Sequence, residues 1–370
     1  MTQAPRLGVL LRATSLALLC FGCGGAETPA PVSQSTEAPT PAPSSAPTLE
    51  IVAEATRRWT GIAVDRSDQI YVNFPRWSDE VPLSVARVDG SELRPFPDAE
   101  WNECWLRDRE PTNCWVCVQS VVVDPGGDLW VLDPGNPGFA GVVDGAPKLV
   151  RFVSTGGSWT VAQKIAFGPP VIQEGSYLND VRFDLERGAA FITDSGDGAL
   201  IVVDLERETA RRLLDAHPST EAEEVVLTIG GQPFDRTVHA DGIAYDPAGV
   251  VYYQSLRGRT LYAIAVDALL DATQSDEALA AAVRVVGETG ASDGLLFHNR
   301  RVLTTALEHD GIRAVNPATG AVEDLVVDPR IAWPDSLAAG RDGSIYFTTA
   351  QIHLGDEARD PFRVWRLSNR

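Results

Sequence analysis

Six segments of this 370-residue sequence share one pattern, and this repeat constrains the fold more than any other feature. Each segment is an apolar run that starts with a polar residue, leads into a polar turn and is followed by a second β-rich run. The first runs are Thr60–Asp65, Gln119–Asp124, Asn179–Asp184, Asp241–Asp246, Asp293–His298 and Asp335–Gly340. The second runs are Ile70–Phe74, Leu129–Leu132, Ala190–Thr193, Val250–Tyr253, Val302–Thr305 and Ile345–Thr348. This spacing is typical of four-stranded blades with loops of varying length.

The repeats predict an all-β fold, a six-bladed β-propeller that spans residues 50–370. Radial repetition protects strand edges that an open sheet of this size would expose. The 9 Trp, 12 Phe and 7 Tyr residues also favour strands over helices. One stretch breaks the pattern, because Val266–Val286 is rich in Ala and Leu. We expect a short helical insert there, between blades 4 and 5.

The N-terminus has the features of a targeting segment. Arg6 and Arg12 flank an apolar run from Leu7 to Phe21 that is too short to span a bilayer. We expect residues 1–22 to be a signal peptide of the lipoprotein type, with Cys23 as the lipidated residue. Residues 23–49, rich in Pro, Ala, Ser and Thr, predict a disordered tether. The expected location is secreted or in the cell envelope, and any membrane contact would be through the lipid. Secretion without lipid is the alternative.

The net charge of −20 excludes nucleic acid as a natural partner, because no run of Lys or Arg interrupts the acidic surface. A cation or a cationic small molecule is the easier partner, although the acidity can also serve solubility alone. We expect a monomer.

Three cysteines remain beyond the targeting segment, and export makes a disulfide plausible. The expected pair is Cys104 with Cys117 or with Cys114, which leaves one thiol free. Zinc is a weaker alternative, since only one C-x-x-C half is present.

Several segments resemble the major royal jelly/yellow protein family. The most specific is Leu178–Asp184, followed by Ala190–Gly196 and Ala199–Asp204. Similar matches are Leu129–Gly135, Ala146–Leu149, Asp241–Tyr245 and Ser292–Gly294. The resemblance covers roughly residues 55–368 and suggests a bacterial member of the family. The resemblance implies a six-bladed propeller that binds a ligand at the mouth of its channel. Some members of the family bind biogenic amines, and others have been linked to the conversion of melanin precursors.

Aligned on their first strands, the repeats give a column of polar residues. The column is Thr60, Gln119, Asn179, Asp241, Asp293 and Asp335, and a column of mostly small residues follows it. Innermost strands line the axis of a propeller, so we expect the polar column to form a ring at one mouth of the channel. Asp180, Asp194 and His239 are expected close by. The alternative is that these polar groups cap strands and turns, as we expect for Asp65 and its counterparts.

Such a ring could bind either of two kinds of cation. A protonated amine could use the carboxylates together with the ring face of Trp59, Trp333 or Tyr177. No cofactor is certain, but Ca²⁺ could bind to Asn179, Asp241 and Asp293, as in the calcium-dependent lactonases of the gluconolactonase/senescence-marker type. That alternative lacks the acidic residue expected in blade 1, where Arg57 to Gly61 stand instead. The other familiar catalytic motifs are absent, so the catalytic residues stay unknown.

Overall fold

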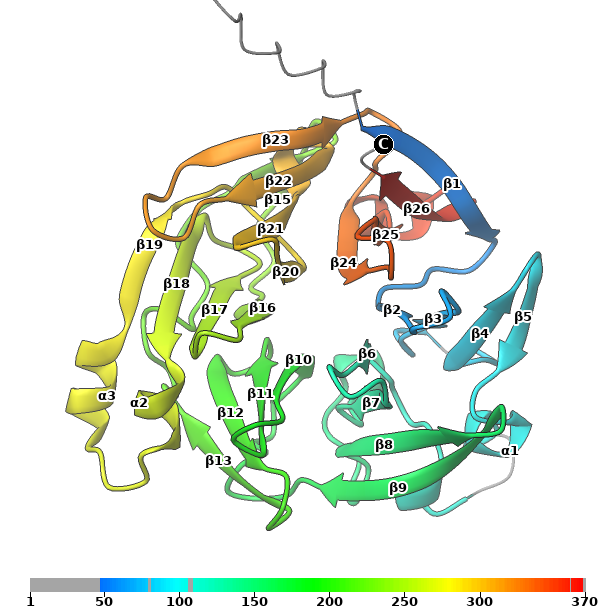
Figure 1. The fold of residues 1–370 in the computed structure, drawn as a ribbon, viewed down its shortest axis with the longest axis horizontal. Helices are drawn as coiled ribbons and strands as arrows, with labels where there is room; N and C mark the ends of the chain where they lie inside the picture. The colour runs from blue at the N-terminus through cyan, green and yellow to red at the C-terminus, as the bar shows by residue number, and fades with distance from the viewer. Residues whose placement is uncertain (1–46, 79–80, 106–108, 360, 369–370) are drawn as a thin grey trace, which may run out of the picture. The chain divides into compact units, whose positions relative to one another are not determined.

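Six four-stranded antiparallel sheets stand around one axis, which confirms the predicted six-bladed propeller (Figure 1). The computed structural model describes residues 47–78, 81–105, 109–359 and 361–368. The predicted signal peptide, Cys23 and most of the predicted tether lie outside these ranges.

Each blade runs from an innermost strand at the axis to an outermost strand at the rim. Blade 1 contains β2 (Ile62–Val64), β3 (Ile70–Asn73), β4 (Val85–Asp89) and β5 (Glu92–Pro95). Blade 2 contains β6 (Ser120–Val123), β7 (Leu129–Asp133), β8 (Lys148–Thr155) and β9 (Ser158–Ala166). Blade 3 contains β10 (Leu178–Asp184), β11 (Ala189–Asp194), β12 (Ala199–Asp204) and β13 (Thr209–Leu213). The repeats of the sequence supply the first two strands of each blade.

The second half of the ring follows the same order. Blade 4 contains β16 (Ala240–Asp246), β17 (Val250–Ser255), β18 (Thr260–Ala265) and β19 (Arg284–Glu288). Blade 5 contains β20 (Leu295–His298), β21 (Arg301–Ala306), β22 (Gly311–Val315) and β23 (Val322–Val327). Blade 6 contains β24 (Pro334–Ala339), β25 (Ile345–Thr349), β26 (Phe362–Ser368) and β1 (Thr48–Ala55).

Blade 6 closes the ring by joining the two ends of the propeller. Its outermost strand β1 comes from the beginning of the described chain and pairs antiparallel with β26, with Thr48 opposite Ser368. Pairing between distant parts of the chain leaves no open end in the ring of blades.

All six innermost strands run in the same direction, so the channel has two chemically different ends. The strands begin at one end, which we call the polar mouth, and finish at the other, which we call the apolar mouth. Crowding at the axis explains the column of small residues. A Cβ on Gly242 would lie 2.4 Å from the carbonyl oxygen of Asp293, and one on Gly294 would lie 2.2 Å from that of Asp335.

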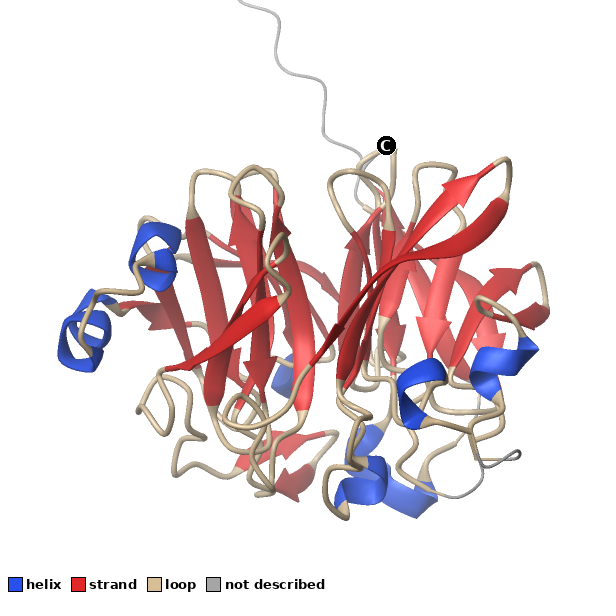
Figure 2. Ribbon diagram, turned by 90° about the horizontal axis from the view of Figure 1, so that it is seen from below, coloured by secondary structure: helices blue, strands red, loops and turns tan. Residues whose placement is uncertain are grey.

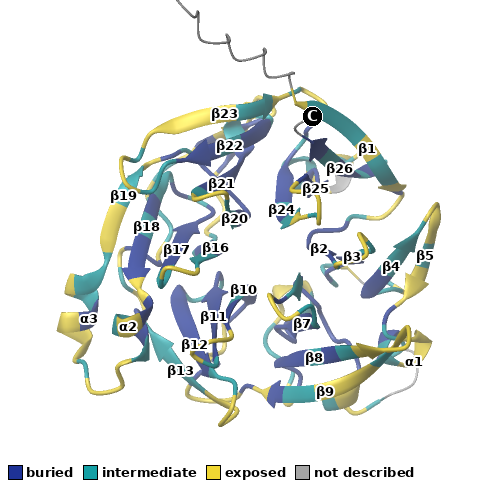
Figure 3. Ribbon diagram, in the orientation of Figure 1, coloured by how far each residue is buried: buried dark blue, intermediate teal, exposed yellow. Residues whose placement is uncertain are grey.

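The core lies between neighbouring blades, where the inner three strands of each blade are largely buried and the outermost strands are more exposed (Figure 3). Large side chains such as Trp130, Phe191 and Phe347 are fully buried in it. Because each sheet is covered on both faces, the strands read as nearly continuous apolar runs.

The predicted insert at Val266–Val286 does contain helices, but they lie within blade 4. Helices α2 (Val266–Leu270) and α3 (Asp276–Ala282) connect β18 to β19, the third and fourth strands of blade 4, and do not stand between blades 4 and 5. Residues 284–286, the last three of the predicted insert, belong to β19. The Ala-rich sequence does not by itself indicate a strand. The segment is nevertheless a short edge strand, because its backbone hydrogen-bonds to β18.

The longer connections gather at the polar mouth, along the lower edge of Figure 2. They include a hairpin of β14 (Leu227–Ile229) and β15 (Gln232–Phe234), helix α1 (Ala99–Asn102) and several 3-10 turns. The 3-10 turns are η1 (Pro111–Asn113), η2 (Pro137–Phe139), η3 (Leu307–His309) and η4 (Ile352–Glu357). No helix of the described chain is long and apolar enough to cross a membrane.

One disulfide closes the loop between blades 1 and 2. It joins Cys104 to Cys114, the second of the two expected pairings, and Cys117 remains a buried free thiol. Cys117 therefore does not take part in the pairing with Cys104 that we considered first. Its backbone N–H instead hydrogen-bonds to the Asp133 carboxylate, across 2.9 Å.

Candidate ligand-binding site

A cavity of about 300 Å³ opens at the polar mouth. Five of the six residues of the predicted polar column line it: Gln119, Asn179, Asp241, Asp293 and Asp335. Each stands at or just before the start of an innermost strand, so the repeat register brings them together. The sixth residue, Thr60, is fully buried and accepts a hydrogen bond from Asn73 instead.

Hydrogen bonds connect five of the lining side chains in a row. The Trp77 indole donates to the hydroxyl of Tyr177 (2.8 Å), which donates to Gln119 Oε1 (2.9 Å). Gln119 Nε2 lies 3.4 Å from Asn179 Oδ1. Asn179 Nδ2 donates to Asp241 Oδ2 over 2.8 Å. A row of this kind fixes each donor and acceptor, so the floor of the cavity is preorganised.

Aromatic side chains form two walls of the cavity. On one side Phe139 packs against both Trp77 and Tyr177, at centroid distances of 5.8 and 4.8 Å. On the other side Phe234 meets Trp333 edge to face at 5.1 Å. Such rings present negative faces and large apolar area to a ligand between them.

Trp333 has an unusual backbone. Its φ angle is +58°, in the left-handed region that bulky residues avoid, although the side chain is fully buried. The indole N–H donates to Asp293 Oδ2 over 2.6 Å, and the Trp333 carbonyl accepts from the N–H of Ala350. Strained residues of this kind concentrate at functional sites, where neighbours hold them in place.

The three carboxyl groups of the cavity share their environment. Burial raises the pKa of Asp293 to about 6, while hydrogen bonds from Trp333 and Asp241 oppose that rise. Burial, followed by the charge of Asp293, raises the pKa of Asp241 and of Asp335 well above the usual range. The negative charge near neutral pH therefore concentrates on Asp293, and its two neighbours favour the protonated form.

Three predicted site residues lie outside this cavity. Asp180 faces the other end of the channel, where it accepts hydrogen bonds from Ser120 (2.9 Å) and Arg182 (3.3 Å). Asp194 is buried in an ion pair with Arg212 at 2.6 Å and also accepts the backbone N–H of Tyr177. His239 uses Nδ1 to accept the backbone N–H of Ala222.

Two of these residues lie outside the cavity lining for the same physical reason. Asp194 and His239 are close to the mouth in sequence, but partners from other strands and loops occupy their polar atoms. Asp194 has the role that we considered as the alternative, since it satisfies backbone donors at a turn. Of the three aromatic rings proposed to face a ligand, Tyr177 and Trp333 line the cavity. Trp59 does not, because it is fully buried and its indole N–H donates a hydrogen bond to the carbonyl oxygen of Arg363.

Sequence reasoning missed several residues of the cavity, four of which have large side chains that bear on ligand binding. Trp77, Phe139, Phe234 and Arg236 lie outside the innermost strands, so the repeat alignment contains no position for them. The one signal was aromatic residues in loops that follow second strands, as Trp77 and Phe139 do. Arg236 is exposed at the rim, with its guanidinium 5.7 Å from the ring centroid of Phe139.

The cavity does not fit a calcium ion. In the described ranges no group of three or more His, Cys, Asp or Glu is arranged to hold a metal. Of the expected ligands, Asn179 directs its amide nitrogen at Asp241, and Asp293 Oδ2 already accepts the Trp333 indole. We derive no chemistry through a metal.

Residues 116–370 match the major royal jelly protein family, which is more than half of the chain. The chain belongs to the major royal jelly protein family. The match begins just before β6 and covers blades 2 to 5 and three of the four strands of blade 6, a narrower range than the resemblance over residues 55–368 that the sequence suggested. No curated protein sequence matches this family member.

Solved structures similar to this family member include several enzymes with propeller folds. A gluconolactonase from Xanthomonas campestris is 12% identical, with a TM-score of 0.54 over 88% of this chain and 90% of its own. A virginiamycin B lyase from Staphylococcus aureus is 10% identical, with a TM-score of 0.52 over 87% and 99%. An aldose sugar dehydrogenase from Streptomyces coelicolor is 12% identical, with a TM-score of 0.51 over 88% and 100%. At these identities the likeness concerns the fold alone.

Proposed function

We propose that this family member binds a small aromatic monoamine in the cavity at the polar mouth. The observation that carries the proposal is the combination of two aromatic walls with a buried Asp293 carboxylate at the floor. A protonated amine would pair with the carboxylate, while its ring would pack between the walls. The volume of about 300 Å³ is at the lower end of small-molecule sites, which favours a single-ring ligand.

The charge distribution supports one positive charge on the ligand rather than two. At the floor, the raised pKa values of Asp241 and Asp335 concentrate the negative charge on Asp293. At the rim, the exposed guanidinium of Arg236 would repel a second cationic group. A ligand with an amine at one end and a neutral ring at the other matches the negative charge at the floor and avoids repulsion by Arg236 at the rim.

Calorimetric titration with tyramine tests the proposal. We expect saturable binding, no comparable binding of the neutral analogue 2-phenylethanol or the anion phenylacetate, and weaker binding of p-xylylenediamine than of 4-methylbenzylamine. Asp293→Asn should weaken tyramine about tenfold or more, because it removes a charge-assisted hydrogen bond.

The matched control is Asp65→Asn, at a turn where Asp65 accepts hydrogen bonds from Ser67 and Gln69. This variant should bind tyramine as the unchanged protein does. Equal losses in the two variants, or equal binding of tyramine and phenylacetate, would contradict an amine site at Asp293.

We also propose that the protein is exported and held at a membrane by lipid on Cys23. Support comes from the sequence, in which an apolar run ends at Gly22-Cys23-Gly24 and an acidic, Pro-rich stretch follows. Membrane fractionation and mass spectrometry of the mature N-terminus test this proposal. Cys23→Ser should release the protein from membranes, and unchanged partition would rule out the lipid.

A further inference from the structure

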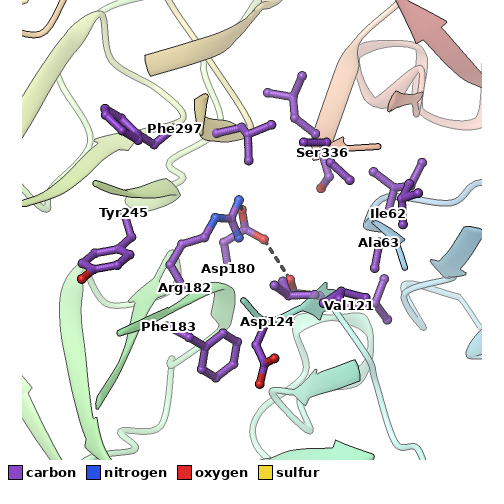
Figure 4. Close-up of a pocket in the computed structure, with 18 of the residues that line it drawn as sticks. Ile62, Ala63, Val121, Asp124, Asp180, Arg182, Phe183, Tyr245, Phe297 and Ser336 are labelled. Atoms are coloured by element: carbon purple, nitrogen blue, oxygen red, sulfur yellow. Dashed lines mark hydrogen bonds and ion pairs between the residues drawn. The ribbon is translucent and has the colours of Figure 1, made fainter. Parts of the chain in front are cut away.

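A second cavity, of about 400 Å³, occupies the apolar mouth (Figure 4). All six innermost strands contribute to it through their later residues, and it shares no lining residue with the cavity at the polar mouth. Its walls are mainly aliphatic and aromatic. They include Ile62, Val64, Val121, Val122, Val123, Phe183, Tyr245, Leu296, Phe297, Leu337 and Ala338.

Arg182 forms the base of this cavity by crossing the channel from β10. Its Nη2 donates to the carbonyl oxygen of Leu295 on blade 5, two blades away, over 2.7 Å. Nη2 also lies 3.3 Å from Asp180 Oδ2, and Nη1 donates to the Val181 carbonyl over 2.7 Å. In Figure 4 the guanidinium lies across the middle of the channel, beside Asp180. Arg182 therefore separates the two cavities.

The base is polar but electrically balanced. The positive charge of Arg182 is paired with the carboxylate of Asp180, and both side chains are largely buried. A charged ligand group placed there would lack a counter-charge, because Arg182 and Asp180 already neutralise each other, and this is unfavourable. A neutral group would avoid this penalty.

Hydrogen-bond donors nevertheless remain at the base. Guanidinium has five N–H groups, and the contacts of Nη1 and Nη2 with Val181, Leu295 and Asp180 use three of them. Nη1 keeps a hydrogen, and Nε is buried without a hydrogen-bond partner. Because Nε is shielded from solvent, the remaining hydrogen of Nη1 is the donor that an oxygen acceptor on a ligand would meet.

We propose that the apolar mouth is a second ligand site, which takes a neutral, largely apolar molecule that presents a carbonyl or hydroxyl oxygen to Arg182. The apolar walls supply affinity, since removing both surfaces from water is favourable. The single polar contact at the base orients the ligand. The two cavities have separate linings, so a ligand in one does not occupy the other.

The fluorescent ketone Prodan is a suitable probe, because it is neutral and apolar and its emission reports the polarity around its carbonyl. We expect saturable binding with a blue shift relative to water. Val122→Trp should fill the cavity and weaken Prodan at least about tenfold, as expected when a ligand loses most of its apolar contact. Val161→Trp, at a valine that is 42% exposed on the outermost strand of blade 2, is the matched control and should bind Prodan normally.

Two further measurements test where Prodan binds. Arg182→Met should shift the emission of bound Prodan further to the blue, because its carbonyl loses the donor. Saturating tyramine should leave Prodan bound. Displacement by tyramine, or unchanged binding in a Val122→Trp variant whose melting temperature and near-UV circular dichroism are preserved, would overturn the proposal. The comparison of Val122→Trp with Val161→Trp is made without tyramine, so it tests the apolar mouth whether or not tyramine binds.

Discussion

Trp333 donates its indole N–H to Asp293 over 2.6 Å and thereby joins the beginning of blade 6 to the beginning of blade 5. The bond acts on the one carboxyl group of the cavity whose pKa lies near neutrality, and it lowers that pKa against the effect of burial. Trp333 accepts an unfavourable φ of +58° in this position. The pair therefore controls how much negative charge the polar mouth presents.

Trp333→Phe should raise the pKa of Asp293 above its present value of about 6, because it removes the hydrogen bond that stabilises the carboxylate. The pH at which tyramine binding reaches half its maximum should rise with it. Calorimetric titrations of both proteins between pH 5 and 8 measure the shift. A variant that binds more weakly with an unchanged midpoint would indicate that the indole acts only through packing.

Tyramine binding to the unchanged protein should itself depend on pH. Asp293 has a pKa of about 6, so its carboxylate forms as the pH rises through that value and protons compete with the amine below it. Affinity should increase about tenfold from pH 5 to pH 7, in proportion to the ionised fraction. Binding that is constant over this range would show that Asp293 does not pair with the amine.

Asp335→Asn should stabilise the protein more at pH 7.5 than at pH 4.5. The folded state raises the pKa of Asp335, so folding retains a proton that the unfolded chain releases above about pH 4. The stability that this carboxyl contributes is complete below the unfolded pKa and is lost as the pH rises through the folded pKa. Asparagine has no such dependence, because it does not ionise.

Calorimetric melting at pH 4.5, 6 and 7.5 measures this effect. The difference in melting temperature between Asp335→Asn and the unchanged protein should grow with pH and reach at least about 2 °C. A difference that is the same at all three values would mean that Asp335 is ionised in the folded protein.

Asp194→Asn should destabilise the protein without acting directly on the ligand. The carboxylate forms a buried ion pair with Arg212, whose side chain is only 6% exposed, and breaking such a pair costs about 3–5 kcal/mol. Asp204→Asn is the matched control in the same blade. Its pair with Arg207 is exposed and should contribute less than about 1 kcal/mol.

Denaturant unfolding and tyramine titration of both variants separate stability from binding. We expect Asp194→Asn to lower the free energy of unfolding strongly while the folded fraction keeps its affinity. If Asp194→Asn had normal stability but no longer bound tyramine, Asp194 would belong to the ligand site, as the sequence analysis predicted.

The repeat register made the blades and the floor of the cavity predictable. Residues such as Asp241 and Asp293 occupy equivalent positions, and equivalent positions in a propeller converge on the axis. The walls were not predictable in this way, because Phe139 and Phe234 come from a 3-10 turn and an added hairpin with no counterpart in the other blades. The partner of Asp194 could not be inferred either, since Arg212 reaches it from β13.

Closure of the ring by β1 also decides at which end of the channel the described chain enters the propeller. Thr48 pairs with Ser368, and Ile345 pairs with Leu367 at the end of blade 6 where β24 finishes, so the chain enters on the side of the apolar mouth. The polar mouth, with Asp293 and its aromatic walls, opens at the opposite end of the channel, so the entering chain and a ligand for that mouth lie at different ends of the propeller.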